Sequence, residues 1–318
     1  MVKRSYIKLH ESGELARRIQ SILGLQVGCR LCPRRCGVDR LHGEKGMCNT
    51  GDLAVVCSYG PHFGEEQPLV GSGGSGTIFF GHCNLHCVFC QNYGTSHFPE
   101  GEGGLEASPS QLANVMLELQ NRGCVNINFV TPSHVVGQIL EALPEAIDRG
   151  LHLPLVYNTS GYDRLETLRL LDGIIDIYLP DFKFFSSKLA RRYLKAPDYP
   201  RQARRAIREM YNQVGDIYLG ENGTVDRGLM VRHLVMPGQV EDSENIIRWI
   251  AEELSKTIYL NLMDQYRPCG RAADFSEINH TLSSAEYRLV REAAVKHGLT
   301  NLDHRDLATL LNRMGGFD

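Results

Sequence analysis

Three closely spaced cysteines constrain this chain more than any other feature of its sequence. Cys83, Cys87 and Cys90 have the spacing C-x3-C-x2-C, with no fourth cysteine nearby. Thiolates are the soft ligands that iron–sulfur clusters use. Because a cubane cluster has four irons, three protein ligands would leave one iron open to a small molecule. The alternative is a structural zinc site, in which His82 or His86 supplies the fourth ligand that zinc requires.

This spacing, with the aromatic Phe89 directly before the third cysteine, resembles the hallmark of the radical S-adenosylmethionine (SAM) superfamily. The resemblance implies that Cys83, Cys87 and Cys90 bind a [4Fe–4S] cluster whose open iron is chelated by the amino and carboxylate groups of SAM. It also implies that one electron from the cluster splits the sulfonium and yields a 5′-deoxyadenosyl radical. Phe89 and Asn92 would then contact the bound cofactor.

The composition of the 318 residues is that of an ordinary globular protein, with 42% hydrophobic residues, 22% charged residues and a net charge of −3. This length predicts one or two domains. The charge balance does not favour nucleic acid as a partner, and no apolar segment suits a membrane span or a secretory signal. Seven of the ten cysteines fall in two tight clusters. That pattern indicates metal ligation in a reducing compartment, so we expect a cytoplasmic protein.

The sequence patterns divide the chain into three expected parts. Residues 1–76 are an irregular, cysteine-rich N-terminal extension, residues 77–270 a barrel, and residues 271–318 a C-terminal helical segment that packs on the barrel. From residue 77 onward, short apolar runs alternate with helical patterns, which is typical of a parallel sheet. Strands are predicted at 77–81, 125–130, 153–158, 174–180, 230–236 and 258–262.

Capping residues mark the helices among these strands. Ser108 is an N-cap followed by Pro109, Gly123 ends that helix, and Ser283 begins a capping box with Glu286. Six β/α units predict an α/β fold, an open (β/α)6 partial TIM barrel of the radical SAM type. In such barrels the chemistry lies at the carboxyl ends of the strands. The cysteine loop follows the first strand directly and therefore lies on that face.

Polar residues that follow the predicted strands are candidate SAM ligands. Thr131 stands where many radical SAM enzymes carry Gly-Gly-Glu, so the resemblance assigns its backbone to SAM. Asn158 and Ser160 follow the third strand and resemble ribose-binding residues, although these residue types also form ordinary turns. His134 is a candidate acid or base, or alternatively a hydrogen-bonded loop residue.

The fourth and fifth strands resemble those of the glycyl-radical activating enzymes. Asp181-Phe-Lys183 resembles their Asp-x-Lys, which implies that the pair lies beside the ribose and carboxylate of SAM. Alternation places Asp181 and Lys183 on the same side of the strand. Arg232 begins a stretch that resembles their Arg-x-x-x-x-Pro-Gly, and either Arg232 or His233 is expected to point toward SAM.

Three cysteines lie outside both clusters. Cys269 follows the sixth strand and is a candidate hydrogen-atom donor, although an isolated cysteine also serves as a small buried hydrophobe. Cys57 and Cys124 have no partners in sequence and are expected to pack in the interior.

The glycine-rich segment 71–76 matches G-x-G-x-x-G. It precedes a strand instead of joining a strand to a helix, so it does not predict a dinucleotide site. We expect a flexible linker or a close approach to the barrel.

Four further cysteines precede the barrel with the spacing C-x2-C-x3-C-x11-C: Cys29, Cys32, Cys36 and Cys48. Four thiolates can close a structural zinc site or bind an auxiliary iron–sulfur cluster, and the spacing alone does not separate these alternatives. The element resembles the N-terminal Cys-x-x-Cys-x-x-x-Cys of an uncharacterised subgroup related to the pyruvate formate-lyase activating enzyme. That resemblance covers roughly residues 25–270.

The resemblance implies a reaction, a substrate class and a reductant. The reaction is hydrogen abstraction from a glycine Cα of a partner glycyl-radical enzyme, with flavodoxin or ferredoxin as the electron donor. Another peptide or a small molecule is the alternative substrate. A different class of function is a non-catalytic iron–sulfur or zinc protein that carries electrons or serves as a scaffold. Nucleic-acid modification would require an appended binding domain, and none is visible in the sequence.

Overall fold

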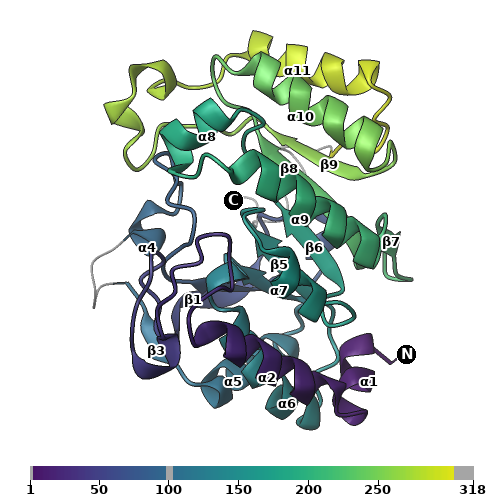
Figure 1. The fold of residues 1–318 in the computed structure, drawn as a ribbon. Coiled ribbons are helices and arrows are strands. Elements are labelled where there is room, and N and C mark those ends of the chain that lie inside the picture. Colours follow the sequence, from purple (N-terminus) through teal and green to yellow (C-terminus); the bar gives the residue numbers. More distant parts are fainter. Residues whose placement is uncertain (1–2, 98–102, 304–318) are drawn as a thin grey trace, which may run out of the picture.

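The computed structural model describes residues 3–97 and 103–303. Its centre is a curved sheet with six parallel strands (Figure 1). In sheet order these are β2 (Ser75–Phe80), β4 (Ile127–Val130), β5 (Leu155–Thr159), β6 (Ile177–Pro180), β8 (Val225–Leu234) and β9 (Tyr259–Met263). Each strand overlaps one of those predicted from the sequence. The predicted partial barrel built from six parallel strands is therefore confirmed.

Three antiparallel strands extend this sheet. They are β1 (Ala54–His62), which pairs with β2, β3 (Leu105–Ala107), which pairs with β1, and β7 (Tyr218–Leu219), which pairs with β8. Within the described residues, no strand pairing joins β9 back to β2. The barrel is accordingly open on one side.

Alternation along the strands separates an inner from an outer face. The inner face carries an apolar cluster of Leu69, Val156, Ile177, Leu179, Val225, Met230 and Tyr259. Arg232 follows Met230 by two residues and so continues this inner row toward the carboxyl end of β8. His233 falls on the outer face, where its ring nitrogens meet the Phe182 carbonyl at 2.7 Å and the Ser243 hydroxyl at 2.8 Å. Of the two residues, Arg232 therefore lies on the inner face and His233 does not.

Helices cover the outer face of the sheet (Figure 1). The longer ones are α2 (Glu14–Gln26), α5 (Pro109–Asn121), α6 (Val136–Asp148), α9 (Tyr199–Val214), α10 (Val240–Glu253) and α11 (Ser284–Lys296). The shorter ones are α1 (Ser5–Glu11), α7 (Leu165–Leu170) and α8 (Ser187–Leu194). Two further short helices, α3 (Gln67–Val70) and α4 (Tyr93–Ser96), lie elsewhere, and Leu69 of α3 packs in the inner apolar cluster. Capping boxes begin α5 and α11, because each N-cap serine and the residue three positions later satisfy one another's backbone N–H groups. The N-cap predicted at Ser108 and the capping box predicted at Ser283 are therefore confirmed.

The N-terminal region is more regular than the sequence suggests. Helices α1 and α2 precede its cysteines, and β1 follows them. Leu15, Ile19 and Ile22 form one buried stripe of α2 at helical spacing, and α2 packs against α6 and α7. The expectation of irregular structure throughout was therefore wrong. The glycines and cysteines that favour loops are concentrated between α2 and β1.

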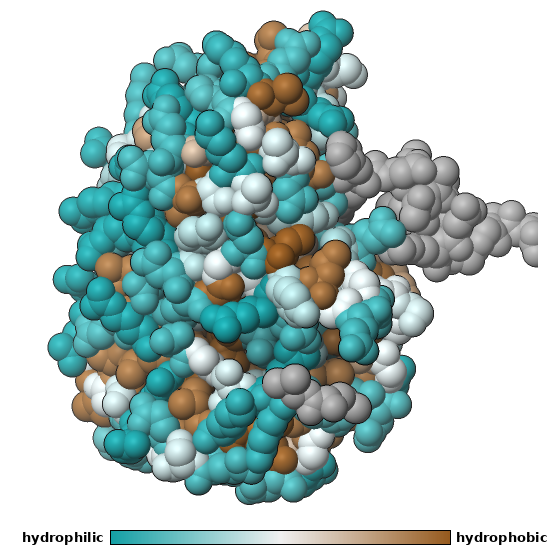
Figure 2. Space-filling model, turned by 90° about the vertical axis from the view of Figure 1, so that its right-hand side faces the viewer, coloured by the Kyte–Doolittle hydropathy of each residue, from teal (hydrophilic) through white to brown (hydrophobic). Residues whose placement is uncertain are grey.

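The predicted C-terminal helical segment is described only in part. Helix α11 packs against α10, while residues 304–318 lie outside the described residues. Among the residues that are described, no helix combines the length and apolar character that crossing a membrane requires. The face shown in Figure 2 is predominantly hydrophilic, with hydrophobic residues scattered among polar ones.

The glycine-rich segment before β2 is a close backbone approach. A Cβ added to Gly73 would lie 1.8 Å from the carbonyl oxygen of Gly123. We therefore expect Gly73→Ala to destabilise the fold by about 1–3 kcal/mol, because the backbone would have to shift. The measurement is the urea unfolding midpoint. Gly60→Ala in β1 is the matched control, since nothing lies within 4 Å of its added Cβ; equal midpoints for the two variants would contradict the prediction.

Candidate functional site

A cavity of about 370 Å³ opens at the carboxyl ends of the parallel strands. Its volume lies within the range of small-molecule sites. The loop that follows β2 and the ends of β4, β5, β6 and β8 supply its walls. The sequence-predicted residues that line it are Cys83, Cys87, Phe89, Cys90, Asn92, Thr131, Asn158, Ser160, Asp181, Lys183 and Arg232.

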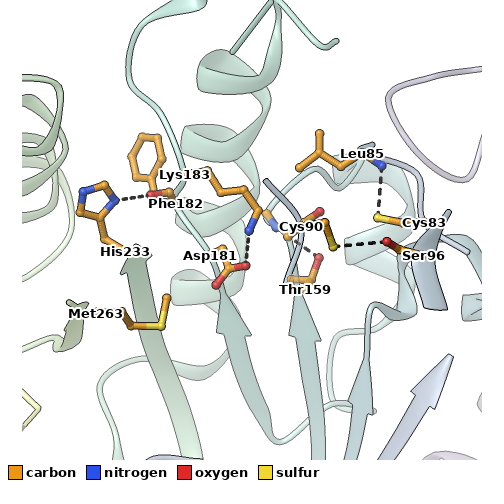
Figure 3. A network of polar contacts seen from close by, with 12 residues as sticks. Cys83, Leu85, Cys90, Ser96, Thr159, Asp181, Phe182, Lys183, His233 and Met263 are labelled. Carbon is orange, nitrogen blue, oxygen red and sulfur yellow. Dashed lines mark hydrogen bonds and ion pairs between the residues drawn. The ribbon is translucent and has the colours of Figure 1, made fainter. Parts of the chain in front are cut away.

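The cysteine loop turns sharply beside two of its cysteines. His82 and His86 adopt left-handed backbone conformations, with φ of 67° and 64°. The Leu85 N–H donates to the Cys83 sulfur at 3.3 Å, and the Ser96 hydroxyl lies 3.2 Å from the Cys90 sulfur (Figure 3). Burial raises the pKa of Cys83 to about 11 and raises the pKa of Cys87 further. A bound metal would have to supply the positive charge that makes thiolates of these groups.

The zinc alternative requires His82 or His86 as a fourth ligand, so the positions of these two side chains matter. The His86 ring nitrogen is 2.8 Å from the Met47 carbonyl, while His82 lines the cavity with the cysteines. Within residues 3–97 and 103–303, no three His, Cys, Asp or Glu side chains are grouped to hold a single metal ion. Three sulfurs around one cavity suit a cluster, in which each thiolate binds a different iron.

Asp181 and Lys183 form an ion pair at the end of β6. The Lys183 ammonium lies 2.6 Å from the Asp181 carboxylate, and Figure 3 shows the pair beside the loop that carries Cys83 and Cys90. Burial alone would lower the pKa of Lys183, but the charge of Asp181 and the hydrogen bond to it outweigh burial and raise that pKa above its usual range. Lys183 therefore stays a fixed cation in the cavity.

Polar groups at the ends of β4 and β5 face the same cavity. Thr131 has a left-handed φ of 61°, which is unusual for a β-branched residue, and its N–H donates to the Asn158 carbonyl at 2.9 Å. The Ser160 hydroxyl is buried and has no hydrogen-bond partner among the described residues. A buried orphan hydroxyl costs free energy unless a ligand satisfies it. The cavity thus combines soft metal ligands, a cation and an unsatisfied hydroxyl, which fits a cluster together with a polar cofactor.

Comparison with known proteins agrees with this chemistry. The sequence model of the radical SAM superfamily matches residues 77–250. The chain belongs to the radical SAM superfamily. That membership implies a [4Fe–4S] cluster and SAM, and it supports an enzyme that performs radical SAM chemistry.

Two similar proteins come from Methanocaldococcus jannaschii. The uncharacterized protein MJ0674 is 31% identical over 279 residues, which cover 85% of this chain and 75% of that protein. The uncharacterized protein MJ0808 is 25% identical over 166 residues, 46% of each chain. Among solved structures, a mutant of spore photoproduct lyase is similar over 71% of this chain and 75% of that one, at 11% identity and a TM-score of 0.45. That likeness is too slight to carry an argument.

Some candidates from the sequence lie outside the radical SAM cavity. His233 does not line it, because strand alternation turns the ring toward α10. Cys269 is half-buried and does not line it either. The His134 side chain is buried, with Nε2 2.8 Å from the Gly81 carbonyl, which agrees with a hydrogen-bonded loop residue. His233 is therefore corrected from a SAM ligand to a residue that packs between strand and helix.

The second set of cysteines comes together in space. Cys29, Cys32, Cys36 and Cys48 line one further cavity, which lies apart from the radical SAM cavity. All four are free of disulfides. Three are buried and Cys36 is half-buried.

Sequence reasoning missed a buried ion cluster beside the radical SAM cavity, which Glu65 and Arg232 of the cluster line. Arg232 pairs with Glu65 and Glu66, and its Nε donates to Glu66 at 2.8 Å. The side chains of Glu65 and Glu66 are 7% and 0% exposed. The Asn261 amide of β9 also donates to Glu66 at 2.6 Å. The only sequence sign of this cluster was the pair of adjacent glutamates, Glu65 and Glu66. That sign was weak, because the region was expected to be irregular and exposed glutamates are common in such regions.

Tyr199 is a second residue that sequence reasoning missed. Its hydroxyl accepts the Lys183 N–H at 2.9 Å and lies 3.0 Å from the carbonyls of Ser160 and Asp181. The side chain comes from α9 and is fully buried. It fixes the loops after β5 and β6 relative to one another, and so positions Lys183 beside the cavity.

Removal of Arg232 from the ion cluster should reverse the direction in which pH changes the stability of the protein. Burial alone would raise the pKa of Glu65, but the charge of Arg232 and hydrogen bonds from His62 and Arg232 lower it to about 2. A lowered folded-state pKa contributes stability above about pH 4.5 that is lost as the pH falls toward about 2. Removal of the cation in Arg232→Met leaves burial to raise the glutamate pKa values. This variant should therefore gain stability as the pH falls from about 7 to 5.

The measurement is the urea unfolding midpoint at pH 7 and pH 5. At pH 7 we expect Arg232→Met to cost about 3–5 kcal/mol, because it removes one side of a buried ion cluster. Arg288→Met is the control, since Arg288 and Glu292 are mostly exposed and 3.8 Å apart; it should change stability by less than about 1 kcal/mol. A variant whose stability falls between pH 7 and pH 5 would refute this account of Arg232.

Proposed function

We propose that this protein reductively cleaves SAM and uses the resulting 5′-deoxyadenosyl radical to abstract hydrogen from a substrate. The observation that supports the proposal is the convergence of Cys83, Cys87 and Cys90 with the Asp181–Lys183 ion pair in one cavity. Three thiolates leave one iron of a cubane cluster without a protein ligand. A fixed cation beside that position would suit the carboxylate of SAM.

The chain's own residues would bind and orient the cofactors. The three cysteines would hold the cluster, and the Lys183 ammonium would pair with the SAM carboxylate. The orphan hydroxyl of Ser160 would satisfy its hydrogen bond on the ribose. Phe89 packs edge-on against Phe184 at 5.8 Å, and this apolar wall would exclude water from the reacting atoms. When bound, the cluster and SAM would supply the electron and the radical.

A glycine Cα of a partner glycyl-radical enzyme is the substrate that we propose. The support is the resemblance of Asp181-Phe-Lys183, and of the stretch that begins at Arg232, to the glycyl-radical activating enzymes. Flavodoxin or ferredoxin would then be the reductant. The absence of Gly-Gly-Glu at 131–134 favours, as the second candidate, a different peptide or small-molecule substrate for the same radical.

The cysteine loop can be tested by product formation. Anaerobically reconstituted protein given SAM and dithionite should form 5′-deoxyadenosine, and Cys87→Ala should reduce that product to background, because one cluster ligand is lost. Chromatographic quantitation of 5′-deoxyadenosine is the measurement. Cys124→Ala is the matched control, since Cys124 is also buried but lies outside both cysteine sets. If Cys87→Ala retained the product, these cysteines would not be the cluster ligands of the reaction.

The cation can be tested by SAM binding. Lys183→Met should weaken SAM affinity by about 10-fold to 150-fold, the equivalent of about 1.5–3 kcal/mol for a hydrogen bond to a charged group. Its iron content should stay that of the wild type, because Lys183 ligates no iron. Equilibrium SAM binding and iron assay on the anaerobic protein measure both quantities. The exposed Lys188 supplies the control variant Lys188→Met; equal SAM affinity in the two variants would argue against a role for Lys183.

A further inference from the structure

We propose that Cys29, Cys32, Cys36 and Cys48 hold a second iron–sulfur cluster, which is built against the loop of the first. This inference does not depend on the proposed reaction, because it concerns a separate cavity. All four cysteines line that cavity together with Arg34, Arg40 and His134.

The local backbone brings the four cysteines to the same cavity. The Cys29 N–H donates to the Val38 carbonyl at 2.7 Å, and the Gly37 N–H donates back to the Cys29 carbonyl at 3.1 Å. Gly46 packs directly on Cys36, since an added Cβ would lie 2.8 Å from its sulfur. The Met47 N–H donates to the Cys36 sulfur at 3.3 Å. Such N–H···S contacts stabilise a thiolate and are one way in which proteins tune iron–sulfur clusters.

The buried side chain of Arg40 lies beside these cysteines and requires a negative charge nearby. Arg40 is 1% exposed, and its guanidinium donates only to the carbonyls of His134, at 2.7 Å, and Gly51, at 2.8 Å. No carboxylate pairs with it in the described part of the chain. A buried charge without a counter-ion is costly. Thiolates would supply the missing charge, whereas four cysteines that served only as small neutral hydrophobes would leave Arg40 uncompensated.

Four thiolates can bind either a single zinc ion or an iron–sulfur cluster. The cavity between the cysteines measures about 10 Å³, so a cluster would have to widen the loop that holds them. Membership of a superfamily that carries a [4Fe–4S] cluster favours a second cluster at the N-terminal cysteines, and zinc is the outcome that would overturn it. Because these cysteines number four, every iron of a cubane would have a protein ligand, and no position would be open to SAM.

Hydrogen bonds join the second cysteine loop to the first. Arg34 lies between Cys32 and Cys36 in sequence, and it donates to the carbonyls of Asn84 at 2.9 Å and Leu85 at 3.0 Å. The Met47 carbonyl, next to Cys48, lies 2.8 Å from the His86 ring. The proposed cluster would thus be part of the support of the catalytic loop.

The test uses a chain from which the first site has been removed. Cys83→Ala/Cys87→Ala/Cys90→Ala protein is purified anaerobically and assayed for iron, acid-labile sulfide and zinc. We expect about four irons and about four sulfides per chain, with little zinc. The reduced protein should give an electron paramagnetic resonance signal that SAM does not change. Since this variant cannot bind the first cluster, the result is independent of whether the wild type forms 5′-deoxyadenosine.

A matched pair of cysteine variants controls the assignment. Added to the triple variant, Cys36→Ala should remove the iron and sulfide, whereas Cys57→Ala, at another half-buried cysteine, should retain them. The single variant Cys36→Ala changes one residue instead of four and so disturbs folding least. It should lower the iron content from about eight to about four per chain. About one zinc without iron in the triple variant would overturn the proposal. So would iron that survives Cys36→Ala, or a wild-type chain that never exceeds about four irons.

Discussion

The architecture depends on a buried ion cluster that bridges the opening of the barrel. Glu66 follows β1, Arg232 lies on β8, and Asn261 lies on β9, the last parallel strand. These side chains connect the segment between β1 and β2 to the far side of the sheet, where strand pairing is absent from the described residues. Leu69 of the same segment enters the inner apolar cluster. Polar bonds therefore tie the two sides of the sheet together just beneath the cavity that carries the chemistry.

Local signals explain how much of the fold the sequence could predict. Each parallel strand is a short apolar run, and the capping boxes at Ser108 and Ser283 are encoded within four residues. The cysteine loop was also predictable, because its chemistry resides in its spacing. Strand alternation further restricted the inward residue of β8 to Arg232 or His233, and only the register of the folded sheet chose between them.

The remaining features could not be predicted from the sequence, because they depend on contacts between distant parts of the chain. Arg232 and Glu66 are 166 residues apart, and no pattern around either one indicates the other. Tyr199, the first residue of α9, bonds the loops after β5 and β6, but in the sequence it looks like an ordinary core aromatic. Helix α2 was missed because the loop-forming residues that follow it dominated the interpretation of the region. These long-range contacts set the positions of groups that the motifs only identify.

The bonds between the two cysteine loops have a consequence for the order in which the protein matures. Arg34 and Met47 can reach the carbonyl of Leu85 and the ring of His86 only when the N-terminal loop is folded. If both loops bind clusters, filling one site orders the other, and by thermodynamic linkage each must favour the other equally. A cluster at one site would then raise the affinity of the other site for its own cluster. A chain that had acquired one cluster would acquire the second more readily than an empty chain would acquire its first.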